Sequence, residues 1–449
     1  MIKDLIEYFK DKKILILGFG REGQSTYNLI RKYLPEQYLY VADLKDNFQD
    51  GFDFLSQDNN VSFISGVKYL DNLNDYDIIM KSPGISFAHM DISSYYHKIK
   101  SQLELLLEFF DNYTIGITGT KGKSTTSSLI YQMLKDQNKK CMLLGNIGIP
   151  VFDYIDTIDQ DFILVLEMSS HQLEFMKQSP NIAILLNIFE EHLDHYDSYN
   201  KYAEAKCNIY RYQKENDYFL YNVDNEMLSS IVDKTNGKTF KVSLNAKDDS
   251  DIYLKDDTVY FGNKPVYSKN EKRELIGNYN LNNIMFVLGA SEILHLDLGQ
   301  TIKSISKFKT LEHRLELVGT FDDIIYYDNS IATIPIATIE AVKALQNVDS
   351  LIIGGMDRGV DYSELIRFLN ESEVRNIICM PKTGHDMAKE LNKEKCHIVN
   401  SMEEAVDIAK KVTQKGKICL LSPAAASYGF FKNFEERGNI FKALVKSTI

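Results

Sequence analysis

The segment GITGTKGKSTT, residues 116–126, combines the residue types that a polyphosphate-binding site requires. Phosphate oxygens accept hydrogen bonds from backbone N–H groups at a helix N-terminus, and glycines let the backbone turn tightly enough for these groups to converge. Lys123 extends from such a loop toward the β and γ phosphates, and the Ser124 hydroxyl is a Mg²⁺ ligand. The usual P-loop spacing is missed by one residue, because Ile117 stands where glycine is expected and Gly116 lies one place earlier. The segment predicts a nucleotide site, and the alternative is a glycine-rich turn with an incidental lysine.

Acidic and histidine side chains stand at the ends of two apolar segments further along the chain. The segment DFILVLE ends at Glu167, and NIAILLNI runs into FEEHLDHY, which contains His192. Ligands of open α/β sheets collect at the carboxyl ends of the strands. Because Mg²⁺ needs only a few oxygen ligands beside its waters, Glu167 and Ser124 together predict a metal site next to the nucleotide. Any one of these polar residues taken alone is more typical of a solvated helix start, and only the segment 116–126 favours the functional interpretation of Glu167 and His192.

A second glycine turn lies near the N-terminus. GFGREG, Gly18 to Gly23, matches the dinucleotide fingerprint, and Asp43 follows in VADLKD. The pattern indicates a phosphate of some nucleotide at the first helix, which need not be NAD. The alternative is a tight turn that needs glycine only to pack a helix on a strand.

Size and composition restrict the class of protein. A chain of 449 residues corresponds to two to four domains at roughly 100–200 residues each. The net charge of −12 argues against a nucleic-acid-binding surface. The five cysteines are far apart and show no metal-type spacing, so reduced thiols are expected. The first residues, MIKDLIEYFKDKK, are too charged for a secretory signal, and these features predict a soluble cytoplasmic protein without a membrane span.

Alternating strand and helix patterns predict an α/β protein with mainly parallel sheets and three domains. KKILILGFG, QSTYNLIRKYL and YLYVADL predict a βαβ opening, and YTIGIT begins a second block. Residues 237–267 predict short antiparallel strands, a small β insertion, and four strands from DIIYYD to GKICLLS predict a third block. We expect a Rossmann-like domain over residues 1–111, a P-loop-type ATPase domain over 112–311 and a Rossmann-like domain over 312–449.

The chain resembles the Mur ligases of peptidoglycan synthesis. GITGTKGKST is similar to their shifted phosphate motif, and LEMSSHQLE, EEHLDHY, YAEAKCNIY, GNYNLNN and EHRLE keep the family's order along the whole chain. The resemblance is to the branch that adds glutamate to UDP-N-acetylmuramoyl-L-alanine. It implies an ATP-dependent acid–amino-acid ligase that forms an acyl phosphate, uses ATP and two Mg²⁺ ions, and acts as a monomer with neither nucleic acid nor membrane as a partner.

The resemblance implies the nucleotide and metal contacts. Lys206 occupies the position of the family's carbamoylated lysine, and a carbamate would convert a cation into an oxygen ligand for Mg²⁺. The implied metal ligands are Ser124, Glu167, His192 and Lys206. The implied nucleotide contacts are Gly119, Thr120, Lys121, Gly122, Lys123, Ser124, Thr125, Asn280, Asn283, Arg314 and Asn329. The implied catalytic residues are Lys123, His192, Lys206 and Arg314.

The resemblance also implies the contacts to the two substrates that are joined. GFGREG and KSPGIS are similar to the uridine-diphosphate site, and GNIGIP is similar to the segment that meets the muramoyl group. The implied contacts to the UDP-linked substrate are Gly18, Gly20, Ser82, Pro83 and Asn146. The implied amino-acid pocket contains Thr333, Arg358, Ser427 and Phe434.

Two positions depart from the family pattern. Tyr279 stands where a histidine is usual, and Ile331 of YYDNSIATIP replaces a lysine, with the acid displaced by one residue. Because a lost charge changes how a dicarboxylate is oriented, both D- and L-glutamate remain open as the substrate. The sequence also leaves open a Mur-type ligase for a diamino acid, a folylpolyglutamate-type ligase and an inactive nucleotide-binding regulator. A nicotinamide oxidoreductase would leave residues 116–126 unexplained.

Overall fold

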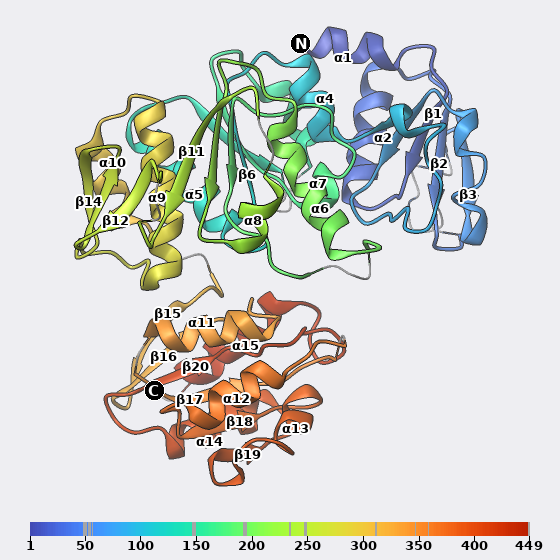
Figure 1. Cartoon of the computed structure of the whole chain (residues 1–449). Helices are drawn as coiled ribbons and strands as arrows, with labels where there is room; N and C mark the ends of the chain where they lie inside the picture. The colour runs from blue at the N-terminus through green and yellow to red at the C-terminus, as the bar shows by residue number, and fades with distance from the viewer. Residues whose placement is uncertain are drawn as a thin grey trace. The chain divides into compact units, whose positions relative to one another are not determined.

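The computed structural model describes the chain except for residues 48–51, 53, 54, 56, 146–149, 192–194, 233, 234, 247, 248, 310, 311, 346, 358, 448 and 449. It forms two compact units, Met1–Lys272 with Asn282–Ser306 and Arg273–Leu281 with Lys307–Ile449 (Figure 1). Three β-sheets organise the chain, two in the first unit and one in the second. The predicted α/β class is confirmed, whereas the domain boundaries near residues 111 and 312 stay a prediction.

The first sheet is parallel throughout, in the strand order β3-β2-β1-β4-β5. Its central strand ILIL is buried along its whole length, because helices cover both faces of such a sheet. The predicted βαβ opening is confirmed as β1, α2 and β2. The elements are α1 (Ile2–Phe9), β1 (Ile14–Leu17), α2 (Arg21–Tyr33), β2 (Leu39–Asp43), β3 (Val61–Ser65), β4 (Ile78–Lys81), β5 (Ile99–Lys100) and α4 (Gln102–Phe109).

The second sheet has nine strands in the order β14-β13-β12-β11-β10-β9-β6-β8-β7. The strands from β7 to β12 pair in parallel, and only β13 and β14 are antiparallel. The strands are β6 (Thr114–Thr118), β7 (Cys141–Gly145), β8 (Ile163–Glu167), β9 (Ile182–Leu185), β10 (Tyr218–Asn222), β11 (Lys238–Ser243), β12 (Ile252–Lys255), β13 (Thr258–Phe261) and β14 (Lys264–Ser268). The helices from residue 123 to residue 307 are α5 (Lys123–Asp136), α6 (Ser170–Leu173), α7 (Tyr199–Arg211), α8 (Glu226–Ile231), α9 (Gly277–Ile293) and α10 (Leu298–Lys307).

The prediction of an antiparallel insertion over residues 237–267 was wrong for its first strand. β11 pairs in parallel with both β10 and β12, with Val242 opposite Ile252, so it extends the parallel sheet. The antiparallel prediction is confirmed for β12, β13 and β14. The alternation of apolar and polar residues identifies a strand, but it does not specify whether the neighbouring strand runs parallel or antiparallel. Here β11 pairs in parallel along the edge of β10.

The third sheet lies in the second unit, in the order β15-β16-β20-β17-β18-β19. Alternate residues of β17 pack on opposite faces: Leu351 and Ile353 contact the core under α11 and α12, and Ile352 contacts the core under α14 and α15. The elements are β15 (Glu316–Phe321), β16 (Ile324–Asp328), α11 (Pro335–Leu345), β17 (Val348–Ile353), α12 (Ser363–Glu371), β18 (Asn376–Cys379), α13 (Thr383–Met387), β19 (Cys396–Ile398), α14 (Met402–Val412), β20 (Ile418–Leu421) and α15 (Phe434–Lys446).

Two further expectations concern the whole chain. All five cysteines are free thiols, as expected from their spacing. Among the residues described, no helix combines the length and the apolar character that crossing a bilayer demands.

Candidate nucleotide and substrate site

The segment predicted to bind phosphate connects β6 to α5 as a strand, a glycine loop and a 14-residue helix. Gly122 caps α5 with φ +91°, a left-handed conformation that favours glycine. The N–H groups of Thr120 and Lys121 donate to the carbonyl and side-chain oxygens of Asn187, each at 2.9 Å. These two bonds fix the loop beyond the end of β9. The N–H groups of a helix's first turn point out of the helix end, and in general such groups suit a phosphate.

Three lysines converge on this loop. The Lys123 ammonium donates to the carbonyl oxygens of Gly119 and Thr120 at 2.8 and 3.1 Å. The Lys206 amine donates to the same Gly119 oxygen at 3.0 Å. Lys121 forms an ion pair of 3.0 Å with Glu191. The positive charges of Lys121 and Lys123 beside a glycine loop are suited to a polyanion.

Lys206 is buried in α7, with 1% of its surface exposed. Its Nζ lies 4.8 Å from the ring centre of Tyr202, whose hydroxyl is 2.9 Å from that of Thr120. Burial, reinforced by the positive charge of Lys123, lowers the pKa of Lys206 well below the ordinary lysine value. The side chain is therefore disposed to be a neutral amine, which is a nucleophile.

Glu167 ends β8 beside the start of α5, as predicted. The Ser124 hydroxyl donates to one oxygen of Glu167 at 3.0 Å, and the Ser127 hydroxyl lies 3.5 Å from the other. The Glu167 side chain is buried, with 2% of its surface exposed. An adjacent hydroxyl and carboxylate are hard oxygen ligands, so Ser124 and Glu167 are suited to hold Mg²⁺.

A cavity of about 250 Å³ joins the phosphate loop to the first sheet. Its lining brings Pro83 and Gly84, which follow β4, together with Lys123 and Lys206. The other lining residues are Ser169, Ser170, His171, Glu191 and Tyr202. A larger hollow of about 600 Å³ lies at the opposite, N-terminal ends of β1 and β2 and contains none of the predicted site residues. The smaller cavity is therefore the candidate active site.

The turn after β1 is built around Gly18. This residue has φ +88°, and a Cβ atom there would lie 2.9 Å from the Cβ of Ser82. The Ser82 hydroxyl donates to the Gly18 carbonyl at 2.7 Å, and Gly20 caps α2. The Asp43 carboxylate accepts the N–H of Phe19 at 2.7 Å. The Asp43 carboxylate thus stabilises the turn. This contact favours a structural role for Asp43 over a role in binding a ribose.

The predicted adenine contacts lie on α9. Asn280 belongs to the second unit and Asn283 to the first, and both are buried. The Asn280 amide donates to the Ile276 carbonyl at 2.9 Å. Their contact with a nucleotide stays a prediction.

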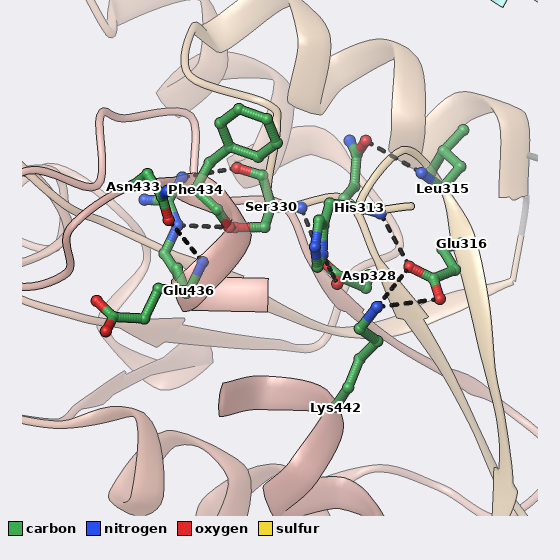
Figure 2. Close-up of polar contacts among 11 residues, drawn as sticks. His313, Leu315, Glu316, Asp328, Ser330, Asn433, Phe434, Glu436 and Lys442 are labelled. Carbon is green, nitrogen blue, oxygen red and sulfur yellow. Dashed lines mark hydrogen bonds and ion pairs between the residues drawn. The ribbon is translucent and has the colours of Figure 1, made fainter. Parts of the chain in front are cut away.

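His313 and Leu315, which flank Arg314 in the sequence, belong to a polar network in the second unit (Figure 2). His313 Nδ1 lies 2.7 Å from the Asp328 carboxylate, and the His313 N–H donates to Glu316 at 2.9 Å. Lys442 pairs with Glu316 at 3.1 Å. Although His313, Glu316 and Asp328 are spaced as metal ligands, Lys442 already balances the charge of Glu316. We interpret the network as a support for Arg314.

Other predicted residues of the second unit have structural partners. The Asn329 side-chain oxygen accepts the Leu315 N–H at 3.2 Å, and its NH₂ group donates to the Ser422 hydroxyl at 3.0 Å. Both polar groups of this side chain therefore bond within the second unit. The Phe434 carbonyl accepts the hydroxyl of Ser330 at 2.8 Å. Ser427 is buried and Thr333 half-buried. Asn146, His192 and Arg358 lie outside the described residues.

Sequence reasoning missed Arg437, which lies within the segment FKNFEERG. Its side chain has no exposed surface and donates to Ser330 Oγ at 3.0 Å, to the Ser330 carbonyl at 2.7 Å and to the Ala425 carbonyl at 3.0 Å. Burial lowers its pKa to about 10, against the opposing effect of the Asp328 charge. Arg437 therefore ties together the segments that carry the predicted amino-acid pocket.

Known proteins resemble this chain over its whole length. Residues 117–291 match the family description "Mur ligase middle domain". A UDP-N-acetylmuramoylalanine–D-glutamate ligase of Clostridioides difficile is 34% identical over 451 residues, 96% of this chain and 98% of that protein. The enzyme of the same name from Acetivibrio thermocellus is 32% identical over 469 residues, 99% of this chain and 98% of that protein.

Solved structures support the fold. The MurF ligase of Thermotoga maritima, solved in complex with ADP, matches 99% of this chain and 97% of its own with a TM-score of 0.61 and 16% identity. The MurC ligase of the same organism matches 98% of this chain and 100% of its own, with a TM-score of 0.61 and 18% identity. Since relatives above 30% identity extend over nearly the entire sequence, the chain belongs to the Mur ligase family.

Proposed function

We propose that this protein is an ATP-dependent ligase that joins D-glutamate to UDP-N-acetylmuramoyl-L-alanine in peptidoglycan synthesis. The observation that carries the proposal is the cavity in which Lys123, Lys206 and the glycine loop adjoin Pro83 and Gly84 of the predicted UDP-substrate site. The names of the relatives at 32–34% identity support the same reaction.

The reaction has two chemical steps. The alanyl carboxylate oxygen attacks the γ-phosphorus of ATP, so that an acyl phosphate forms and ADP leaves. The glutamate nitrogen then attacks the acyl carbonyl, and phosphate leaves with the bonding electron pair. The protein contributes mainly by positioning the reactants and neutralising charge. Lys123 stabilises the charge on the transferring phosphoryl group, and Arg314 is the second cation that the family resemblance assigns to the nucleotide.

Two metal ions belong to the proposal. When bound, Mg²⁺ neutralises charge on the phosphate oxygens. Ser124 and Glu167 would hold one ion, and His192 with Lys206 would hold a second. The buried Lys206 side chain, whose pKa is lowered by burial, can in its neutral amine form add to CO₂ and release a proton, giving a carbamate. The nearby ammonium groups of Lys123 and Lys121 would balance its negative charge. The carbamate therefore has a suitable electrostatic environment here.

The test is an amide-formation assay with purified protein, UDP-N-acetylmuramoyl-L-alanine, ATP and Mg²⁺, with D- and L-glutamate supplied separately. We expect ADP release and amide formation with D-glutamate. Formation with L-glutamate alone would favour the other stereochemistry, which the loss of charge at Ile331 makes the second candidate. No ADP release with any acceptor would support an inactive nucleotide-binding regulator.

Lys123→Ala tests the phosphate loop within the same assay. We expect turnover to fall at least about a hundredfold, since removing one charge-stabilising donor costs about this much. Lys135→Ala is the matched control, because Lys135 lies exposed in the last turn of the same helix. Equal turnover in both variants would contradict the role of Lys123.

A further inference from the structure

Lys81 is a buried cation that the proposed reaction does not use. It ends β4, and only 6% of its surface is exposed. The ammonium lies 5.2 Å from the ring centre of Phe175 and 5.9 Å from that of Phe87. Within the described part of the chain it is a buried nitrogen without a hydrogen-bond partner. Its nearest acid is Glu174, with Nζ and Oε2 3.6 Å apart. A cation in such surroundings is costly unless the opposite charge remains in place.

Glu174 directly follows the short helix α6, in the connection between β8 and β9 of the second sheet. The same Oε2 atom that faces Lys81 lies 3.1 Å from His195 Nε2. The His195 ring packs edge-on against His171, with the ring centres 4.2 Å apart. The Ser86 hydroxyl, from the first sheet's side, donates to the His195 carbonyl at 2.8 Å. Lys81, Glu174 and His195 therefore form a continuous polar bridge between the two sheets.

Both ends of this bridge lead to the candidate active site. Pro83 and Gly84, two and three residues after Lys81, form one side of the cavity. His171, which packs on His195, lines the same cavity from α6. A second contact strengthens the connection, since the Gln172 amide of α6 donates to Glu22 of α2 at 3.0 Å. The positive charge of Lys81 also acts on Glu22. The bridge thus sets how the turn after β4 faces α6 across the cavity.

We propose that Lys81 and Glu174 are positioning residues that hold the two walls of the cavity at the separation required by the UDP-linked substrate. The proposal rests on the proposed function for the identity of that substrate. Neither side chain is expected to touch a reacting atom. Breaking one member of a buried charge pair leaves the other uncompensated, so the turn and α6 would separate or rotate. Binding of the UDP-linked substrate would weaken, whereas the phosphate loop, fixed by Asn187, would retain ATP affinity.

The test compares Lys81→Met with wild type in the full-length protein. We expect KM for the UDP-linked substrate to rise about tenfold or more, and KM for ATP to change less than about twofold. Lys81→Arg, which keeps the charge, should recover part of the loss, and Glu174→Gln should reproduce the Lys81→Met pattern. Lys177→Met is the matched control. Lys177 also crosses between the sheets, donating to the Tyr96 carbonyl at 3.2 Å, but it does not line the cavity.

Several outcomes would overturn the proposal. One is an equal rise of both KM values, and another is a rise of the same size in Lys177→Met. Lower thermal stability in Lys81→Met with unchanged KM values would show that Lys81 and Glu174 stabilise the fold without positioning the substrate. If Lys81→Met does not fold, the KM values of Glu174→Gln test the proposal instead. Calorimetric binding of the UDP-linked substrate, without ATP or glutamate, separates the two proposals. If the wild-type protein binds this substrate but forms no amide, the proposed reaction is refuted. The affinities of the Lys81 and Glu174 variants for the substrate would still test the positioning role of the bridge.

Discussion

Replacing Gly438 by alanine tests the network that supports Arg314. Gly438 lies in α15, where a Cβ atom would come 2.2 Å from His313 Nδ1 and 2.6 Å from Asp328 Oδ2. Both contacts are shorter than real Cβ atoms tolerate. His313 and Asp328 cannot easily move away, because they are buried and joined by the bond of 2.7 Å. The added methyl group must displace one of them or the helix.

The sign of the effect distinguishes this clash from helix propensity. Alanine in place of glycine ordinarily stabilises a helix by about 0.5–1 kcal/mol. Overpacking a filled site costs about 1–3 kcal/mol, and a buried polar group that loses its partner costs about 1–3 kcal/mol more. We expect Gly438→Ala to lower the free energy of unfolding of its unit by about 1–5 kcal/mol.

Urea denaturation followed by circular dichroism measures this change. Gly299→Ala in α10 is the matched control, since its Cβ would meet only Asp297 at an ordinary 3.4 Å. The control should be unchanged or slightly more stable. The KM for ATP should also rise in Gly438→Ala, because His313 precedes Arg314. A Gly438→Ala protein as stable as wild type, or more stable, would refute the packing argument.

Three further predictions address single side chains. The pKa of Lys206 is lower in the folded chain than the ordinary lysine value of about 10.4. Between these two pKa values the unfolded chain binds more protons than the folded chain, so the free energy of unfolding should rise with pH. The rise should be seen relative to Lys206→Met in bicarbonate-free buffer. Urea titrations at several alkaline pH values check this, and a constant difference between the two proteins would contradict it. Ser124→Ala should weaken Mn²⁺ binding, measured with the nucleotide by electron paramagnetic resonance, whereas Ser127→Ala, whose hydroxyl lies farther from Glu167, should weaken it less. Arg437→Met should destabilise the second unit by about 3–5 kcal/mol in thermal unfolding, because the carbonyls of Ser330 and Ala425 would lose a buried donor; an unchanged melting temperature would show that water replaces the guanidinium.

The positions of the chemical groups along the strands were readable from sequence. Glu167 could be placed at a strand end, and Lys123 at the start of a helix, because buried apolar runs and glycine turns are local signals. The direction of β11 was not readable, because pairing depends on a distant neighbour. The partners of Asn329 were not readable either: its amide joins Leu315 and Ser422, and no spacing indicates such contacts.

Buried charges were the hardest to predict. Arg437 and Lys81 would ordinarily be assigned to the surface, since lysine and arginine are rarely fully buried unless paired. Only the folded chain brings Ser330 to Arg437 and Glu174 to Lys81. The carbamate at Lys206 follows from the resemblance alone and stays a proposal, whereas the burial of this lysine was not readable from the sequence.

The hairpin of β13 and β14 has a consequence for solubility in crowded conditions. A long parallel sheet exposes unpaired N–H and C=O groups along its last strand, and these can recruit a strand of another molecule. Here the outermost strand β14 contains Pro265, which has no N–H to offer, beside the exposed Lys264. A bulge between Val259 and Tyr260 further distorts this margin. The hairpin therefore closes the sheet against edge-to-edge aggregation, and deleting residues 257–268 would expose β12 to it.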